Sequence, residues 1–221
     1  MKKVLLIMAA LCVLLAGCSN AEVEKETANN ASEVVQEESG VKVVALPDDT
    51  MENLSDAILA VSLEEGGAYV DDTGAMQMDL KIYSYDKFDM VDMATMKVGD
   101  TIVTHDGEVL VQSLEQDANG TYIINGGLEA GGIQLATDES GVFYEVGFND
   151  AKNWYEAGEA TIRVSVDFVY YDYSDMDQGE VVYYPGSFLI GEVTDYHFVP
   201  SNTTIRVENG QIVEMFRNYM P

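Results

Sequence analysis

Short turn sequences recur at close intervals along this chain and separate runs of β-branched and aromatic residues. Asp-Gly, Asn-Gly and related turn signals fall at 71–74, 106–107, 119–120, 125–126, 139–141 and 209–210. These residue pairs adopt the backbone angles of tight hairpins, and their placement between alternating apolar runs is typical of antiparallel strands. The spacing therefore predicts a protein of short β-strands with little helix.

Two runs show the period of two that a half-buried strand requires. In the run 76–83 the apolar face comprises Met76, Met78, Leu80 and Ile82. In the run 162–171 we expect one buried face made of Ile162, Val164, Val166, Phe168 and Tyr170. Further strands are predicted at 57–63, 101–104, 108–114, 121–124, 132–137, 142–146, 181–184, 188–193, 203–207 and 211–217.

Two segments carry helical signals. Asp49 and Glu52 have the spacing of a capping box, which makes a helix over 50–60 an alternative to the strand at 57–63. The second segment, 86–96, predicts a short helical turn with Phe88, Val91 and Met96 facing inward.

Taken together, these patterns predict an all-β domain over residues 41–221. We expect an antiparallel meander that forms a sandwich or a partly open barrel, with at most one or two short helices. About 180 residues with this apolar content suffice for a buried core, since 47% of the whole chain is hydrophobic.

The charge balance excludes one class of function. The chain of 221 residues has 39 Asp and Glu against 11 Lys and Arg, a formal net charge of −28. Binding to nucleic acid needs clustered basic residues that release counterions from phosphates, so no nucleic-acid partner is expected. An anionic lipid surface would repel the domain for the same reason.

The N-terminus has the features of a secretion signal. Lys2 and Lys3 precede an apolar run, Val4 to Leu15, that is too short to span about 30 Å of hydrocarbon as a helix. The run ends in Leu15-Ala16-Gly17-Cys18, which resembles the lipobox of bacterial lipoproteins. The resemblance implies that residues 1–17 are a signal peptide and that the Cys18 thiol carries a diacylglycerol. It also implies a cell-envelope protein, anchored by its N-terminal lipid on the extracytoplasmic side of a bacterial membrane.

The segment after the expected lipidation site is polar. Residues 19–40 contain six Glu, one Lys and no aromatic residue, so we predict that 18–40 are a lipidated N-terminus and disordered acidic tether. Cys12 lies inside the signal peptide and Cys18 is the lipidated residue, and the chain has no other cysteine. Disulfides, cysteine nucleophiles and cysteine-based metal sites are therefore excluded for the β domain.

Three motifs are better explained by structure than by catalysis. Asp72-Thr73-Gly74 matches the core of aspartic proteases, but the chain has no second copy and the tripeptide fits an acidic hairpin turn. The glycine-rich loop 126–132 lacks the lysine and following helix of a phosphate cradle. His105 and His197 have no partner at a catalytic spacing and are expected to be surface or capping residues. No catalytic set is predicted.

One acidic group has the composition of a weak calcium site. Asp172, Asp175, Asp177 and Glu180 are the densest set of hard oxygen ligands in the chain. Ca²⁺ takes about six to eight such oxygens. Calcium is therefore the one possible cofactor, and a polar hairpin tip is the alternative explanation.

The second half of the chain is rich in tyrosine and holds the single tryptophan. Aromatic side chains on a sheet face stack on sugars or pack against partner proteins. The predicted ligand-binding residues are Trp154, Tyr155, Tyr171 and Tyr173.

These observations leave two main functional hypotheses and a minor third one, a purely structural or assembly role. The first is a lipid-anchored cell-envelope protein whose β domain binds a glycan, a peptide or a partner protein. The alternative is an envelope hydrolase that uses carboxylates. Perturbed carboxylates converging in a deep pocket would favour the hydrolase, and a shallow aromatic strip would favour binding.

Overall fold

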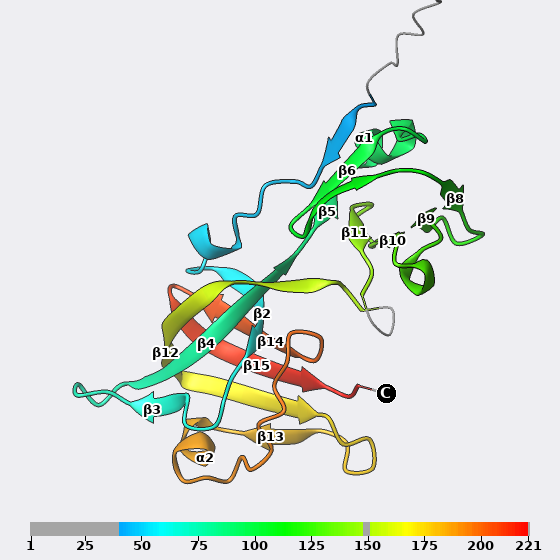
Figure 1. Cartoon of the computed structure of the whole chain (residues 1–221). Coiled ribbons are helices and arrows are strands. Elements are labelled where there is room, and N and C mark those ends of the chain that lie inside the picture. Colours follow the sequence, from blue (N-terminus) through cyan, green and yellow to red (C-terminus); the bar gives the residue numbers. More distant parts are fainter. Residues whose placement is uncertain (1–39, 148–150, 221) are drawn as a thin grey trace, which may run out of the picture. The chain divides into compact units, whose positions relative to one another are not determined.

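The computed structural model describes residues 40–147 and 151–220, all of which belong to one compact unit. These residues form the strands β1–β15 in three sheets, together with two short α-helices and two single-turn 3₁₀ helices (Figure 1). The prediction of a sandwich-like all-β fold with at most two short helices is confirmed.

The largest sheet has seven strands and wraps around a core. In sheet order it comprises β13 (Val181–Tyr183), β12 (Trp154–Tyr173), β15 (Gln211–Asn218), β14 (Thr203–Glu208), β2 (Ala57–Ser62), β4 (Met76–Tyr85) and β3 (Ala68–Val70). The first half of β12 pairs with β4 and its second half pairs with β15. Pairing therefore runs through β12, β15, β14, β2 and β4 and returns to β12, which closes these five strands into a barrel-like ring.

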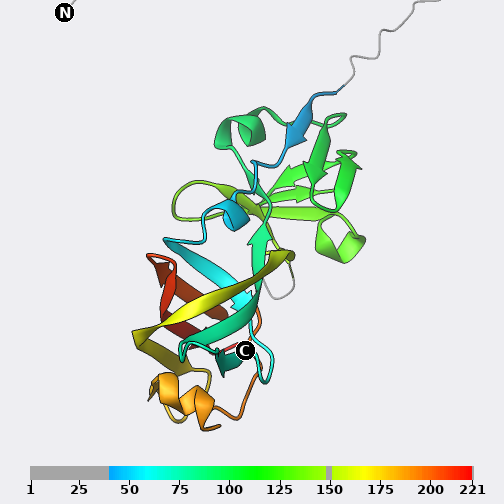
Figure 2. The same ribbon diagram turned by 90° about the vertical axis from the view of Figure 1, so that its left-hand side faces the viewer.

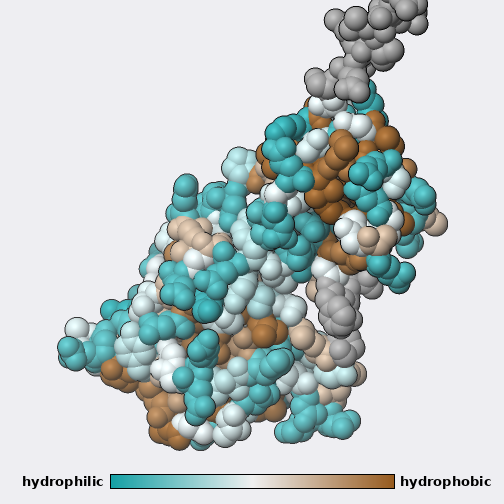
Figure 3. Space-filling model, viewed as in Figure 1, coloured by the Kyte–Doolittle hydropathy of each residue, from teal (hydrophilic) through white to brown (hydrophobic). Residues whose placement is uncertain are grey.

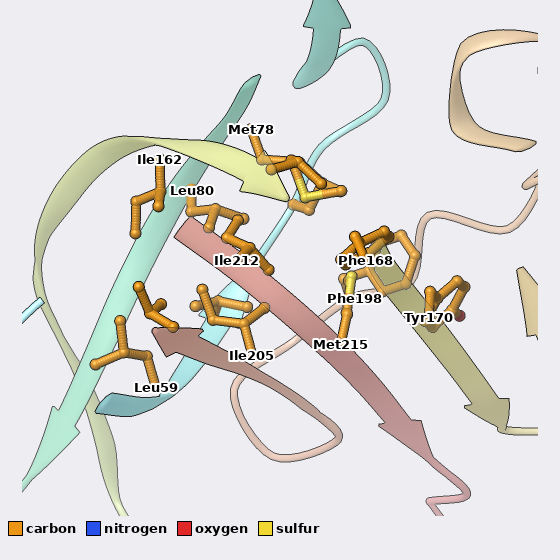
Figure 4. Packing of buried hydrophobic residues seen from close by; sticks show 14 of the residues in the cluster. Leu59, Met78, Leu80, Ile162, Phe168, Tyr170, Phe198, Ile205, Ile212 and Met215 are labelled. Carbon is orange, nitrogen blue, oxygen red and sulfur yellow. The ribbon is translucent and has the colours of Figure 1, made fainter. Parts of the chain in front are cut away.

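The ring is filled by the inward faces of its strands. Leu59, Leu80, Ile162, Ile205 and Ile212 come from five different strands and gather between them (Figure 4). The alternation of Met76, Met78, Leu80 and Ile82 on β4 agrees with the sequence pattern, since all four side chains are buried. Burial of apolar surface on this scale is the main source of stability of the ring.

Two smaller sheets surround a second core. One has the order β5 (Lys87–Phe88), β11 (Phe143–Glu145), β10 (Ile133–Thr137), β9 (Tyr122–Ile124) and β8 (Leu114–Gln116). The other comprises β1 (Lys42–Val44), β6 (Thr101–Thr104) and β7 (Gly107–Leu110). Their shared core contains Val43, Phe88, Met93, Met96, Ile102, Val111, Ile124, Ile133, Leu135 and Phe143.

Strand β4 leads from the large sheet to the smaller ones. It ends at Tyr85, and after Asp86 the chain continues directly as β5, which pairs with β11 (Figures 1 and 2). The start of β12 runs antiparallel to this end of β4.

Two pairings differ from a simple antiparallel meander. β1 pairs with β6 in parallel, and β12 pairs with β15 in parallel. Parallel neighbours need a long crossover rather than a tight turn. In the second pair the crossover includes β13, α2 (Pro185–Leu189) and β14.

Strand β12 begins earlier than predicted and contains an irregularity. Its pairing with β15 shifts register between Val164 and Val169, which is the mark of a β-bulge. The shift turns Val166 outward, so that it is 87% exposed and not part of the buried face that we expected. Ile162, Val164, Phe168 and Tyr170 are buried as predicted.

The helix considered over 50–60 does not form. Only η1 (Thr50–Glu52) is helical there, and Asp49 makes no side-chain capping bond. β2 follows instead, because Leu59, Ala60 and Val61 are buried between β14 and β4.

The helical turn predicted over 86–96 is confirmed in part as α1 (Met90–Thr95), which Asp89 caps through the backbone N–H of Val91. Val91 is exposed, contrary to the predicted inward face, and Met93 is buried in its place.

Two predicted strands also need correction. The segment 188–193 holds the end of α2 and a turn, because Pro185 at the first helical position favours a helix start. The strand predicted at 108–114 is divided between β7 and β8, with buried Val111 in the connection. The other helical element, η2 (Leu128–Ala130), lies in the glycine-rich loop.

The surface reflects the acidic composition. Hydrophilic residues cover much of the face seen in Figure 3, and an apolar patch lies at the end of the large sheet where Figure 1 places α2. Exposed apolar side chains on and beside α2 are Tyr184, Leu189 and Ile190.

Candidate functional site

The end of β4 separates two groups of functional side chains. Successive residues of a strand point to opposite faces, so Tyr83 and Tyr85 project to one side, while Ser84 and the following Asp86 project to the other. Ser84 and Asp86 are buried, whereas the two tyrosines are half-buried. The register with β12 places Trp154 opposite Tyr85 and Tyr155 opposite Ser84.

The first face is an aromatic groove, which we call the Tyr85 groove and define by Tyr83, Tyr85, Lys87, Lys152 and Trp154. It belongs to a hollow of about 450 Å³ between β2, η1, β4 and the start of β12. The Tyr85 and Trp154 rings meet edge to face, with centroids 5.1 Å apart. Edge-to-face packing fixes the rings and leaves part of each available for a ligand.

Two lysines bring positive charge to the Tyr85 groove, and Asp49 is the one acidic residue that lines the same hollow. The Lys152 ammonium lies 3.8 Å from the centroid of Tyr85 and 5.6 Å from that of Trp154, and the Lys87 ammonium lies 5.1 Å from Tyr85. Both lysines therefore make cation–π contacts with the Tyr85 ring. Neither lysine forms an ion pair with a carboxylate of the described residues. Both lysines thus lie against the same tyrosine ring, in a chain whose net charge is −28.

The second face holds the Asp86 cluster, which consists of Asp86, His105 and Glu145. Asp86 accepts a hydrogen bond from the backbone N–H of His105 at 2.9 Å, and its Oδ2 lies 2.7 Å from the Nδ1 of the same histidine. His105 was expected as a surface or capping residue, and the residue is exposed at the surface, with 24% of its side chain accessible. The Tyr155 ring packs against the His105 imidazole at an interplanar angle of 31°, with ring centroids 4.2 Å apart.

Glu145 completes the Asp86 cluster from β11. The residue is 8% exposed, and its Oε2 has no hydrogen-bond partner among the described residues. Burial raises the pKa of the Glu145 carboxyl, and the negative charge of Asp86 raises it further. One ligand atom from each of the three side chains lies within 4.8 Å of the other two.

The four predicted aromatic residues do not converge. Trp154 lines the Tyr85 groove, and Tyr155 lies on the opposite face, where its hydroxyl donates to Asp48 at 3.2 Å. Tyr171 stacks on Phe216 within the large sheet, and the Tyr173 hydroxyl donates to Glu180. Tyr171 and Tyr173 lie at the other end of β12 from Trp154.

The predicted calcium ligands are engaged in other contacts. Arg217 donates to both oxygens of Asp172, at 3.1 and 2.7 Å, and the Tyr170 hydroxyl donates to one of them at 2.7 Å. Asp175 accepts from the Gln178 amide.

The backbone N–H of Asp177 donates a hydrogen bond to the Asp175 carboxylate, and the Glu180 carboxylate accepts one from the Tyr173 hydroxyl. Among the described residues, no three of Asp172, Asp175, Asp177 and Glu180 bring ligand atoms within 4.8 Å of one another. Calcium binding by these residues stays a prediction.

The Asp72-Thr73-Gly74 turn and the glycine-rich loop 126–132 have structural roles. In the hairpin between β3 and β4, Asp71 accepts from the backbone N–H groups of Thr73 and Ala75, and hydrogen bonds led by the Thr73 hydroxyl hold its pKa far below the usual range. In the glycine-rich loop a Cβ at Gly132 would lie 2.1 Å from the carbonyl oxygen of Ile124. Glycine is needed there for close approach of the backbone.

A second hollow of about 480 Å³ is acidic, with Glu64, Glu65, Asp79 and Glu159 around Lys81. No three of these carboxylates come together. Asp79 is already bonded to the hydroxyls of Tyr69 and Thr161.

Sequence reasoning missed the Asp86 cluster and most of the Tyr85 groove. A signal for the cluster was present, because Asp86 continues the inward positions of β4 and Glu145 follows buried Phe143 with strand spacing. Charged residues are rarely buried, so an acidic residue at an inward position of a strand can be recognised as unusual in the sequence. Nothing in the spacing links these two positions to His105.

Cys18 lies outside the described residues. None of the helices in the described ranges is long and apolar enough to cross a membrane. Comparison of the chain with protein-family models, with curated proteins and with solved structures finds no match.

Proposed function

We propose that this protein is a lipid-anchored cell-envelope protein whose β domain binds an anionic glycan in the Tyr85 groove. The observation that carries the binding proposal is the pairing of aromatic rings with two lysines that form no ion pair with a carboxylate of the described residues. Support for the anchor is the lipobox that ends at Cys18.

The lysines indicate the charge of the ligand. The domain repels anions over most of its surface because the chain is strongly acidic, with 39 acidic against 11 basic residues over its full length. An anion can therefore approach favourably only where positive charge is concentrated. Lys87 and Lys152 provide such a place, because an ammonium group can donate hydrogen bonds to a carboxylate or sulfate.

The strand pairing favours a glycan over an extended peptide. Peptides that bind sheets add a strand to an open edge. At the groove β4 has no open edge, since Tyr83 pairs with Ala60 of β2 on one side and Glu156 of β12 on the other. A ligand must lie on side chains rather than on the backbone. The hollow of about 450 Å³ is within the size range of small-molecule sites, about 300–1,000 Å³.

The carboxylate-hydrolase alternative receives less support. Glu145 is the one described carboxylic acid whose pKa is raised above its ordinary value, because burial and Asp86 disfavour its charge. It lies on the face opposite the Tyr85 groove and is 8% exposed. In the acidic hollow around Lys81, no three carboxylates of the described residues lie within 4.8 Å of one another.

Calorimetric titration tests the proposal. The probes are tetragalacturonate, which carries a carboxylate on every sugar, neutral maltotetraose of equal length, and a tetraglutamate peptide. We expect binding of tetragalacturonate alone, and at least a tenfold loss of affinity in Lys87→Gln with Lys152→Gln. The matched control is Lys97→Gln, an exposed lysine that also lacks a described ion pair. Equal affinity for the peptide, or no binding of the uronate, would contradict the glycan proposal.

A further inference from the structure

We propose that Asp86, His105 and Glu145 form a binding site for a divalent transition-metal ion, with zinc as the preferred ion. The site lies on the face of β4 opposite the Tyr85 groove and is independent of glycan binding. Its ligands come from three segments: the end of β4, the turn between β6 and β7, and β11.

The first argument is the balance of charge. Two carboxylates, Asp86 at 5% and Glu145 at 8% exposure, lie close together away from water. Buried carboxylates are normally paired or bound to a metal, because an unpaired buried charge is costly. Asp86 has His105 as its partner, but Oε2 of Glu145 has none among the described residues. A cation between them would neutralise both acids and satisfy that oxygen.

The second argument is the geometry of the ligand atoms. The three atoms lie within 4.8 Å of one another, and His105 Nδ1 is 2.7 Å from Asp86 Oδ2. In a tetrahedral zinc site with bonds of about 2.1 Å, ligand atoms are about 3.4 Å apart. Small rotations of side chains therefore suffice to bring all three into coordination. In the metal-bound form zinc takes the place of the hydrogen between Nδ1 and the carboxylate.

Neighbouring groups hold the imidazole in a suitable orientation. Asp106 Oδ1 lies 3.2 Å from Nε2 of His105 and can accept its hydrogen, which leaves Nδ1 for the metal. Metal-bound histidines commonly use their second nitrogen in this way. The adjacent ring of Tyr155 limits rotation of the imidazole.

The types of ligand atom indicate which metal ion the site prefers. One imidazole nitrogen and two carboxylate oxygens suit zinc, and three protein ligands leave a fourth position for water or another molecule. Ca²⁺ prefers about six to eight oxygens, and Mg²⁺ retains most of its water. The partly exposed edge of His105 provides access from solvent.

The experiment uses the untagged full chain purified in detergent. Zinc content after desalting and zinc affinity by calorimetry are measured for the wild type, His105→Gln and Glu145→Gln. Folding of each variant is checked by thermal unfolding. His197→Gln is the matched control, since His197 is exposed and lies outside the cluster.

We expect one zinc per wild-type chain and at least a tenfold loss of affinity in both cluster variants. The His197→Gln control should bind as the wild type does. Calcium and magnesium at equal concentration should raise the melting temperature less than zinc. Unchanged zinc affinity in folded His105→Gln, or equal responses to zinc and magnesium in the wild type, would overturn the proposal.

Discussion

Tyr85 and Asp86 are consecutive residues whose side chains enter opposite faces at the end of β4. Tyr85 lies against Trp154 and Lys152 in the groove, and Asp86 lies buried against His105. This arrangement is a direct consequence of strand geometry, in which neighbouring side chains alternate. Two sites can therefore share one strand end and remain chemically separate.

Substitutions at these two positions should separate the two proposed activities. Tyr85→Leu is expected to reduce affinity for tetragalacturonate about tenfold, or ~1.4 kcal/mol, because it removes the ring that contacts Trp154 and both lysines. It should leave zinc affinity unchanged. Asp86→Asn should weaken zinc binding and leave uronate affinity unchanged. Calorimetry with both ligands measures this, and loss of both activities in either folded variant would show that the sites are coupled.

The pair Arg217 and Asp172 should be important for stability. Both side chains are almost fully buried, and Arg217 donates to both carboxylate oxygens. Removal of one partner leaves an uncompensated buried charge, so Arg217→Met should lower the free energy of unfolding by about 3 kcal/mol. Arg206→Met removes pairs with Glu208 and Glu214 that are more exposed, and its effect should be much smaller. Urea denaturation measures the free energy of unfolding of both variants. Equal losses in the two variants would contradict the importance of the buried Arg217–Asp172 pair for stability.

The same pair predicts part of the acid sensitivity. Burial alone would raise the pKa of the Asp172 carboxyl, but hydrogen bonds from Arg217, Ser174 and Tyr170 outweigh burial and hold that pKa below its ordinary value. The ionised form is therefore favoured in the folded state. Its contribution to stability is present above the unfolded pKa of about 3.9 and is lost as pH falls through the folded pKa.

Asp172→Asn should reduce the slope of unfolding free energy against pH between about pH 4 and pH 2. Urea denaturation over this range measures the slope. An unchanged slope in the variant would assign the acid sensitivity to other carboxylates.

The lipid anchor has a direct chemical test. Cys18→Ala should abolish labelling by a fatty acid in growing cells and release the chain from the membrane fraction, because Cys18 supplies the acylated thiol that the lipobox implies. Cys12→Ala is the matched control and should be labelled like the wild type. Labelling of the Cys18 variant would show that the lipoprotein resemblance is misleading.

Local patterns were sufficient to predict most strands. The alternation in 76–83 predicted the buried face of β4, and the Asp-Gly and Asn-Gly turn signals predicted the positions of most hairpins. Non-local effects caused the errors. The bulge that exposes Val166 depends on register with β15, which is remote in sequence. The segment after Asp49 has helical spacing, but burial of Leu59 and Val61 between two strands outweighs that local preference.

The candidate sites were harder to predict for a related reason. Trp154 was identified as a contact residue, but its groove also needs Tyr85 and Lys152, which become neighbours only through pairing of β12 with β4. His105 and Glu145 are separated from each other by 40 positions in the sequence; His105 lies in the turn between β6 and β7, and Glu145 lies on β11 of another sheet. No spacing rule connects such residues, because tertiary pairing brings them together.

The most direct test of glycan binding in the Tyr85 groove is the indole N–H resonance of Trp154 in a ¹⁵N-correlated NMR spectrum. Trp154 is the only tryptophan in the chain, so this signal needs no assignment. We predict that tetragalacturonate shifts the resonance progressively to saturation, whereas maltotetraose does not. Uronate binding that shifts other resonances and leaves the Trp154 indole unchanged would contradict the account.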